Sequence, residues 1–539
     1  MNTLNGATFM SLVVGLILAI PLSLVVTRLF KKKVEKLINS ENDFNEILSE
    51  PTLLVNPIPF PGITKLTTPV SHAHTYLGKT KTYLSHFIPG LLVCFMILYS
   101  NYLQGGSIVM MTAFYLFLCV CFPLLFVTYT LKPSGNDFFG KLLKIYFLLH
   151  IMFIVYFLFR SKPSDVFGIL YLFLMNIGPT LIFFWLNSRT TIKAIAPFMF
   201  PVIFIGSLFI MLGVTLLMGN QAALENVFNT FFVFLDALNI HGLTNVTLYS
   251  VVFILFMGFA ILGLLLLRGT YNSKNINGQI LLIDCLWLTQ VIFMTSMPYN
   301  DHRAITYAFL ILLVYKIVQL VMMKLLGQNA HAGSHQQLLV LRVFSLGKES
   351  EKLFGYVASN WLSKGYIKLI AGFDLTNSLV DIDDLLTYLS GGIRKRFCLS
   401  ETLIIENVNK IDKLPDIDGR YRVNEMYCNN STWKTVLDKL LPGTNRILMD
   451  LRGFSAANKG CIHEIQQIIY SVPMEKVLFV SDSKGLQHGA DMYTIMKIAW
   501  ETIPASSPNY ANTETVFCVF EYNNKKDLPG LLYHLSSFE

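Results

Sequence analysis

Long apolar stretches dominate the first 327 residues and constrain the fold more than any other feature of the sequence. A helix needs about 20 apolar residues to cross a bilayer. Stretches of that kind lie at residues 8–30, 84–103, 107–131, 142–160, 165–187, 195–219, 246–267, 279–298 and 304–326. Residues 338–539 instead have the charge mixture of a soluble domain. The sequence therefore predicts a transmembrane domain of about nine helices at 1–327, a linker at 328–337 and a globular domain at 338–539.

Basic residues at the ends of these stretches predict their orientation. Lys31, Lys32 and Lys33 follow the first apolar stretch, whereas in a signal peptide the positive charge precedes it. The positive-inside rule places this cluster in the cytoplasm and the N-terminus outside. Nine spans then leave the C-terminal domain in the cytoplasm, and the absence of a disulfide or metal-ligand spacing among the eight cysteines fits that reducing compartment.

The net charge of +8 arises largely at the ends of the apolar stretches, so the bilayer is the expected partner and nucleic acid is not. Within the stretches, Asp284 and Lys316 stand out because intramembrane charge is costly. They form either an ion or substrate path or one structural pair between neighbouring helices. Residues 223–241 have an apolar side typical of an interfacial or re-entrant helix.

Residues 31–83 form the one long loop between the predicted spans. Its first part, up to residue 50, has the pattern of an amphipathic helix, and its proline-rich second part, 51–69, is predicted to have no regular structure. We expect this loop to pack on the membrane surface or on the C-terminal domain.

The C-terminal domain alternates between short apolar runs and amphipathic segments. The runs predicted as strands are 338–344, 366–372, 402–408, 446–451, 476–482 and 516–522. Continuous apolar runs indicate strands buried on both faces, and hence a parallel sheet flanked by helices. The predicted fold is a multi-span α-helical membrane domain followed by an α/β domain of flavodoxin-like order. Neither GxGxxG nor a P-loop occurs, so no Rossmann dinucleotide site or NTP hydrolysis is indicated.

Residues 446–469 have the strand–loop–helix pattern at which ligands bind in parallel sheets. The run Ile447–Leu451 ends in a short polar loop, and a helix follows with His463 and Glu464 near its start. We expect any chemistry of this chain to lie here.

Three stretches of the domain resemble the TIR (Toll/interleukin-1 receptor) family, including its bacterial relatives. They are LRVFS at 341–345, STWKTVLDKLLPGTNRILMDL at 431–451, and the segment from Ser455 to Glu464, which is similar to the family's serine loop and Trp-Cys-x-x-Glu motif. Gly460 stands where the family has tryptophan. The resemblance implies NAD as substrate and Glu464 as the carboxylate that contacts the ribose during glycosidic cleavage, with Ser455, Arg452 and Asn458 as loop contacts.

Residues 398–430 form an insertion relative to that family. Its dense polar side chains predict a substrate-facing wall, and Arg420 and Arg422 are its candidate contacts. The DIDGR segment at 416–420 has a hint of a calcium loop but lacks the later glutamate, so a turn is expected and no metal is predicted.

The polar and titratable residues singled out in the 446–469 segment also have a structural interpretation. Glu464 is then a solvent-facing carboxylate that favours the helix dipole, and Ser455 and Asn458 are N-capping residues. Cys461 is predicted to be a small buried residue, and Arg452 either holds a phosphate or is exposed.

The leading hypothesis is a membrane-anchored effector, in an inner membrane if bacterial, that binds or cleaves NAD or a related nucleotide and needs no further cofactor. The first alternative is a non-enzymatic signalling module that self-associates through the TIR-like domain or the spans. The second is a transporter with a regulatory domain.

Overall fold

The structure is a computed structural model of the full chain. It describes residues 3–38, 59–67, 77–105, 110–131, 138–160, 163–189, 191–219, 258, 262–263, 266–296, 303–326, 336–342, 348–371, 382–389, 391–429, 431–455, 458–482, 490–510 and 515–537.

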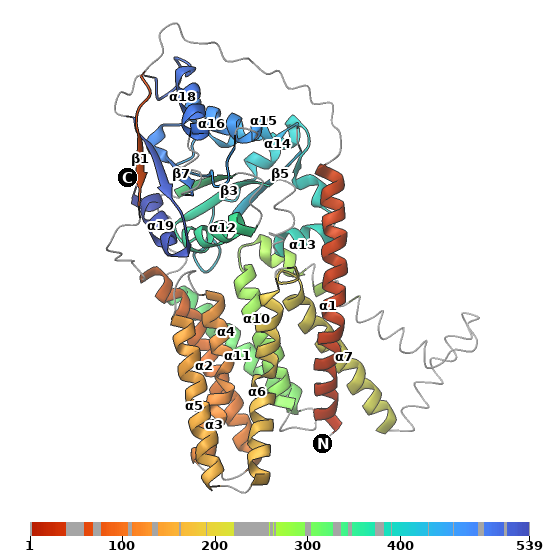
Figure 1. Ribbon diagram of the computed structural model, residues 1–539. Coiled ribbons are helices and arrows are strands. Elements are labelled where there is room, and N and C mark those ends of the chain that lie inside the picture. Colours follow the sequence, from red (N-terminus) through yellow and green to blue (C-terminus); the bar gives the residue numbers. More distant parts are fainter. Residues whose placement is uncertain are drawn as a thin grey trace, which may run out of the picture.

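The chain forms a bundle of long helices with an α/β domain at one end of it (Figure 1). The bundle helices are α1 (Thr3–Ile38), α2 (Leu77–Gly105), α3 (Met110–Val120), α4 (Phe122–Leu131), α5 (Phe138–Arg160), α6 (Pro163–Ser188), α7 (Ala196–Gly219), α10 (Gly278–Ser296) and α11 (Arg303–Leu325). Among the described residues, six helices are long and apolar enough to cross a membrane. Segment 223–241 and most of the predicted span 246–267 lie outside the described residues.

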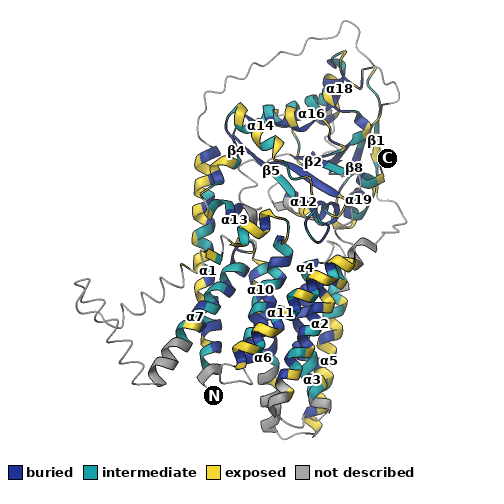
Figure 2. Cartoon of the chain, turned by 180° about the vertical axis from the view of Figure 1, so that it is seen from behind, coloured by how far each residue is buried: buried dark blue, intermediate teal, exposed yellow. Residues whose placement is uncertain are grey.

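The long helices of the bundle have many exposed residues, which Figure 2 draws in yellow. Large apolar side chains are among them. On α5, Ile151, Met152 and Phe159 are 57%, 59% and 88% exposed. Soluble proteins rarely expose contiguous apolar patches of this extent. The exposed faces are therefore compatible with an integral membrane protein, as the sequence predicts.

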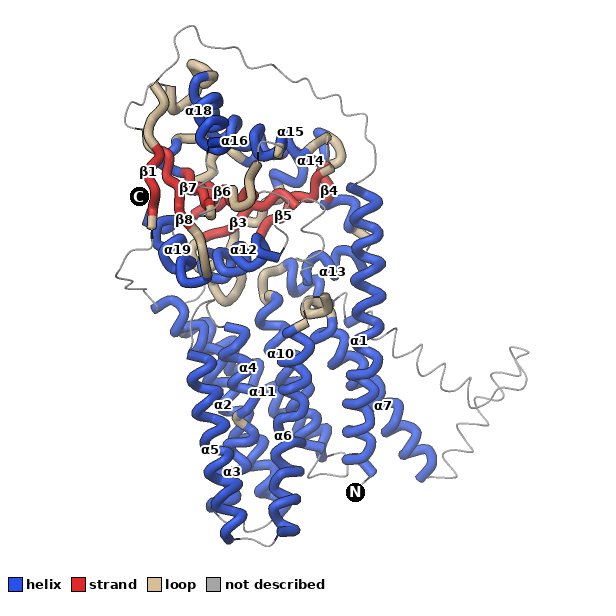
Figure 3. Tube along the Cα trace, viewed as in Figure 1, coloured by secondary structure: helices blue, strands red, loops and turns tan. Residues whose placement is uncertain are grey.

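The α/β domain contains one sheet of eight parallel strands (Figure 3). Its spatial order is β1-β8-β7-β6-β2-β3-β5-β4. The strands are β1 (Ile63–Leu66), β2 (Gln336–Arg342), β3 (Gly365–Ala371), β4 (Phe397–Cys398), β5 (Val423–Cys428), β6 (Arg446–Asp450), β7 (Val477–Ser481) and β8 (Phe517–Glu521). The predicted parallel sheet and five of its strands, those near 338, 366, 446, 476 and 516, are confirmed.

Helices cover both faces of this sheet. They are α12 (Lys348–Trp361), α14 (Glu401–Asn409), α15 (Trp433–Leu440), α16 (Lys459–Ser471), α18 (Ala490–Glu501) and α19 (Leu528–Ser537). Helix α13 (Ile382–Leu389) instead packs with α1 and the bundle. Because successive side chains of a strand point to opposite faces, Leu338 packs with α12 and α19, while Leu339 packs with α14, α15, α16 and α18.

The predicted strand at 402–408 is wrong, because this run lies in helix α14. Ser400 caps the helix by accepting a hydrogen bond from the Leu403 amide, and Ile404 is buried in the core. The strand position is taken instead by β5, whose sequence VNEMYC is too polar at its start to read as a buried run. A short apolar run does not by itself distinguish a strand from one face of a helix.

The prediction that residues 51–69 have no regular structure is also wrong, because β1 extends the sheet beside β8. Two contacts fix its approach: Trp500 Nε1 donates to the Pro59 carbonyl at 3.1 Å, and the Phe60 ring stacks on Phe517 at 5.2 Å. The prolines precede the strand, where proline is tolerated. The expected packing of this loop on the C-terminal domain is confirmed.

Helix α1 continues past the bundle and packs beside the opposite edge of the sheet (Figure 1). Its residues Phe30, Val34 and Leu37 form one cluster with Phe397 and Tyr427. The N-terminal segment therefore lies against both edges, with α1 near β4 and β1 on β8. Covered edges protect a sheet from pairing with other chains.

A substitution at the start of β3 tests this packing. In Gly365→Ala the new Cβ would lie 1.8 Å from the Gln336 carbonyl oxygen of β2, so the strands must separate. We expect a loss of about 2 kcal/mol, measured as a lower midpoint of thermal unfolding of the full chain in detergent. Gly355→Ala on α12 is the control, because nothing lies within 4 Å of its Cβ, and helix propensity favours it by about 1 kcal/mol. Equal midpoints for the two variants would contradict the β2–β3 register.

Candidate functional site

The carboxyl edge of the sheet between β2 and β6 is the first candidate site. Strand β2 leads to α12 on one face, and β6 leads to α16 on the other. Ligands of open α/β sheets bind at such a point, where the helices on either side diverge. The structure places Ser350, Asp450 and Arg452 there.

Arg452 and Asp450 form a buried ion pair at this edge. Arg452 Nε donates to Asp450 Oδ1 at 2.8 Å, and Nη2 donates to Oδ2 at 2.7 Å. Ser350 Oγ also donates to Oδ2, at 3.1 Å, and the guanidinium lies 4.7 Å from the Tyr522 ring centre. Arg452 is only 4% exposed. It is therefore not the exposed arginine of one interpretation, and in this structure its charge is directed at Asp450.

Glu464 lies on the buried face of α16 and is 1% exposed. The interpretation of a solvent-facing carboxylate is therefore wrong. The spacing explains why: Cys461, Ile465 and Ile468 form the apolar stripe of this helix, and position 464 falls within it. The burial of Cys461 is confirmed. Burial, together with the nearby carboxylates of Glu464 and Asp450, raises the pKa of the Cys461 thiol to about 12. Both carboxylates thus act on the same small buried region.

Ser455 and Asn458 lie at the exposed start of this helix. Asn458 occupies the N-cap position, but its side chain makes no capping hydrogen bond. Its Oδ1 instead accepts from the Ser455 amide at 2.8 Å and from Ser455 Oγ at 3.0 Å. The two residues therefore brace the loop rather than the helix.

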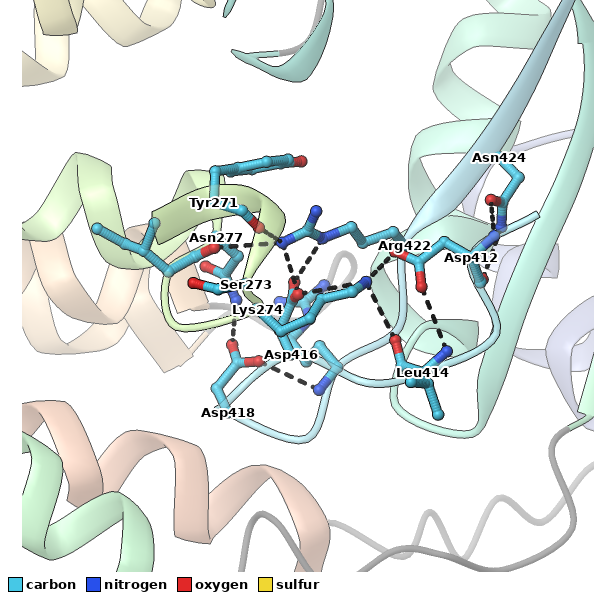
Figure 4. Close-up of polar contacts among 12 residues, drawn as sticks. Tyr271, Ser273, Lys274, Asn277, Asp412, Leu414, Asp416, Asp418, Arg422 and Asn424 are labelled. Carbon is cyan, nitrogen blue, oxygen red and sulfur yellow. Dashed lines mark hydrogen bonds and ion pairs between the residues drawn. The ribbon is translucent and has the colours of Figure 1, made fainter. Parts of the chain in front are cut away.

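Arg422 lies elsewhere, at the contact between the α/β domain and the bundle (Figure 4). It pairs with Asp416, Nη2 to Oδ1 at 2.7 Å. The same Nη2 donates to the Tyr271 carbonyl at 2.8 Å, and the guanidinium stacks 3.8 Å from the Tyr271 ring centre. Tyr271 lies near the end of the helical residues 266–272, just before the turn that leads into α10. Arg422 therefore holds the segment 398–430 against the helix bundle.

Lys274 makes the matching contact from the bundle side (Figure 4). Its Nζ donates to Asp412 and lies 3.7 Å from Asp416 Oδ1. Its carbonyl accepts from the Ile417 amide at 3.0 Å, and Asn277 Nδ2 donates to Asp418 at 2.7 Å. The DIDGR segment forms the expected turn, with Gly419 at φ +79°. That turn is the piece that docks onto the bundle.

The predicted site residues thus fall into two groups. Arg452, Ser455, Asn458 and Glu464 lie at the carboxyl edge of β6 and in the loop and helix that follow it. Arg420 and Arg422 lie with the bundle, where Arg420 Nη1 donates to Gln279 of α10. Sequence reasoning missed Asp450 and Ser350. Asp450 had one available signal, since it is a carboxylate next to the end of a predicted buried strand.

Asp284 and Lys316 form a pair that joins α10 and α11, Nζ to Oδ2 at 2.5 Å. Tyr315 donates to Asp284 Oδ1 at 3.0 Å, and Gln319 Oε1 accepts from Lys316 at 2.8 Å. The interpretation of a structural pair between neighbouring helices accounts for this geometry.

Comparison with protein-family models finds no family that matches this chain. Comparisons with curated proteins and with solved structures find no match either.

The Cys461 thiol should resist alkylation in the folded chain. With a pKa of about 12, about one thiol in a thousand is ionised at pH 9. Glu464→Gln removes one of the two nearby carboxylates, so we expect a lower thiol pKa and faster alkylation at the same pH. Mass spectrometry after iodoacetamide treatment measures this, and Glu475→Gln on the exposed surface is the control. Reaction of native Cys461 at pH 8 as fast as in the unfolded chain would contradict the prediction.

A charge reversal tests the contact between insertion and bundle. Lys274→Glu places a carboxylate against Asp412 and Asp416 and should lower the unfolding midpoint. Adding Asp412→Lys should restore part of the loss, with a coupling energy of about 1 kcal/mol in a double-mutant cycle. Lys410→Glu is the control, because Lys410 pairs with Glu406 on the exposed surface at the end of α14. Additive effects of the two substitutions would mean that the pair contributes nothing.

Proposed function

We propose that this chain is a membrane-anchored effector whose α/β domain binds NAD or a related nucleotide at its carboxyl edge. One observation carries the proposal: Ser350, Asp450, Arg452 and Glu464 place buried polar groups where α12 and α16 diverge. The order β8-β7-β6-β2-β3 supports it, because this is the strand order of flavodoxin-like sheets, which bind their ligand at that edge.

We also infer that the α/β domain lies in the cytoplasm. Lys31, Lys32 and Lys33 lie on α1 after the apolar span and among the residues that pack on the domain, between Phe30 and Val34. These lysines are thus on the same side of the membrane as the α/β domain, and the positive-inside rule assigns that side to the cytoplasm. The N-terminus of α1 is then outside.

Glu464 is the residue that would support cleavage of a bound dinucleotide. Breaking the glycosidic bond develops positive charge on the ribose, and a fixed carboxylate stabilises that charge. A carboxylate that is 1% exposed meets a substrate only after the surrounding edge opens. The geometry therefore supports nucleotide binding more directly than cleavage.

The test uses the full chain in detergent with NAD, following nicotinamide release and the shift of the unfolding midpoint. Glu464→Gln keeps the shape of the side chain but removes its charge. We expect it to lower release by about 10²-fold while NAD still raises the midpoint. The matched control, Glu475→Gln, should leave both unchanged. Release that is unaffected in Glu464→Gln would reject the catalytic role, and the absence of any midpoint shift with NAD in the native chain would reject the binding site.

The contacts between domain and bundle favour the second candidate, a non-enzymatic signalling module. Lys274, Tyr271 and Arg422 tie the insertion to the connection before α10, and α1 and β1 add further contacts. Such a domain responds to changes in the helices without any chemistry. An absence of NAD binding and of nicotinamide release, even from protein clustered at high density in vesicles, would favour this module.

A further inference from the structure

A cavity lies where the bundle meets the α/β domain, away from the β2–β6 edge. Its volume is about 520 Å³. Its wall includes the ends of α4 and α6, the start of α10, and the residues that precede β5. We call it the boundary pocket. The polar residues used below are Lys193, Arg420 and Gln279, all of which line it.

The boundary pocket has an excess of positive charge. Its lining includes Lys193, Arg420 and Arg422, and Asp416 is its carboxylate. Asp416 is already paired with Arg422 and approached by Lys274. In the part of the chain that the structure describes, no carboxylate pairs with Arg420. The pocket is therefore suited to an anion.

Arg420 is held in place for such a contact. It donates to Gln279 Oε1, and Gln279 Nε2 donates to the Thr130 carbonyl at 3.3 Å. The Arg420 amide donates to Asp418 Oδ1 at 3.1 Å. These bonds fix the guanidinium between α4 and α10 without neutralising its charge.

An apolar path continues from this pocket into the bundle. Phe198 lines both the boundary pocket and a second cavity of about 380 Å³. Ile205 and Leu312 line both that cavity and a third one of about 190 Å³. The three cavities follow one another along α7 and α10, and the second and third also border α11. The Asp284–Lys316 pair lines the second cavity, but its charges are directed at each other.

We propose that the boundary pocket binds the phosphate head group of an anionic phospholipid, whose acyl chain follows the apolar cavities. The head group meets Lys193 and Arg420, and the chain extends from Phe198 towards Leu312. A soluble phosphate has the chemistry for the first part only, so the apolar path favours the lipid. Because the turn that carries Arg420 also docks onto the bundle, the bound lipid joins the α/β domain to the helices.

The test is thermal unfolding of the full chain in detergent after removal of bound lipid. Phosphatidylglycerol, phosphatidylcholine with the same acyl chains, and glycerol phosphate are added separately. We expect phosphatidylglycerol to raise the midpoint by several degrees and the other two to have little effect. Equal stabilisation by phosphatidylcholine would overturn the charge selectivity. Equal stabilisation by glycerol phosphate would show a soluble anion as the ligand and overturn the lipid.

Two variants locate the effect. Arg420→Gln and Lys193→Gln should each reduce the shift caused by phosphatidylglycerol at least twofold. Lys439→Gln on the exposed surface of α15 should leave it unchanged. The midpoint without lipid shows whether each variant folds, and Lys193 lies outside the turn that carries Arg420. A full lipid effect in both variants would overturn the proposal.

Discussion

The buried contact among Arg422, Asp416 and Tyr271 is the interaction on which the relation between the two parts of the chain depends. Asp416 is 3% exposed, and a buried charge is tolerated only when it is paired and hydrogen-bonded. Arg422 pairs with Asp416 and also donates a hydrogen bond to the Tyr271 carbonyl of the bundle. Separating the domain from the helices would thus leave polar groups on both sides without their partners. The start of β5 is fixed to the bundle for that reason.

The N-terminal segment adds a second restraint that sequence boundaries do not reveal. A division into residues 1–327 and 338–539 assigns α1 and β1 to the membrane part, yet both pack on the α/β domain. Trp500 donates to Pro59, and Phe60 stacks on Phe517. A fragment that begins at the linker would expose the β8 edge and the surface under α1. The full chain is accordingly the proper subject for every experiment on the domain.

The sequence correctly predicts the strands that are buried along nearly their whole length. It assigns wrongly, or misses, the elements that are buried on one side or over part of their length. Strands near 338 and 476 are buried on both faces, and their continuous apolar runs identify them. Residues 402–408 also contain an apolar run, at 403–405, but the Ser400 cap and the single buried side chain of Ile404 make them a helix. Strand β5 is not predicted from the sequence, because its first half lies near the contact with the bundle and is only half-buried and partly polar. No local pattern predicts β1, since four residues form a strand only where β8 offers an unpaired edge.

The candidate site is also predicted only in part from the sequence. The position of Glu464 in the strand–loop–helix unit follows from its sequence, and so does the position of Arg452. The burial of Arg452 also depends on Asp450 and Ser350, which come from elements about 100 residues apart, and no spacing rule brings those together. Arg420 and Arg422 show the converse, since dense polar character is equally typical of a ligand wall and of a docking surface. Only the connection before α10 decides between them.

The two candidate sites lie at opposite ends of the strands of one sheet. Val423 at the start of β5 and Leu362 just before β3 line the boundary pocket, whereas Asp450 ends β6 at the carboxyl edge. Strands β5, β3, β2 and β6 pair in continuous register between them, and a paired sheet moves as a body. The same four strands therefore connect the two sites without a break. The contacts of α1 beside β4 and of β1 on β8 attach this sheet to the N-terminal segment at both outer strands, so that segment holds the sheet on either side of the strands that join the two sites.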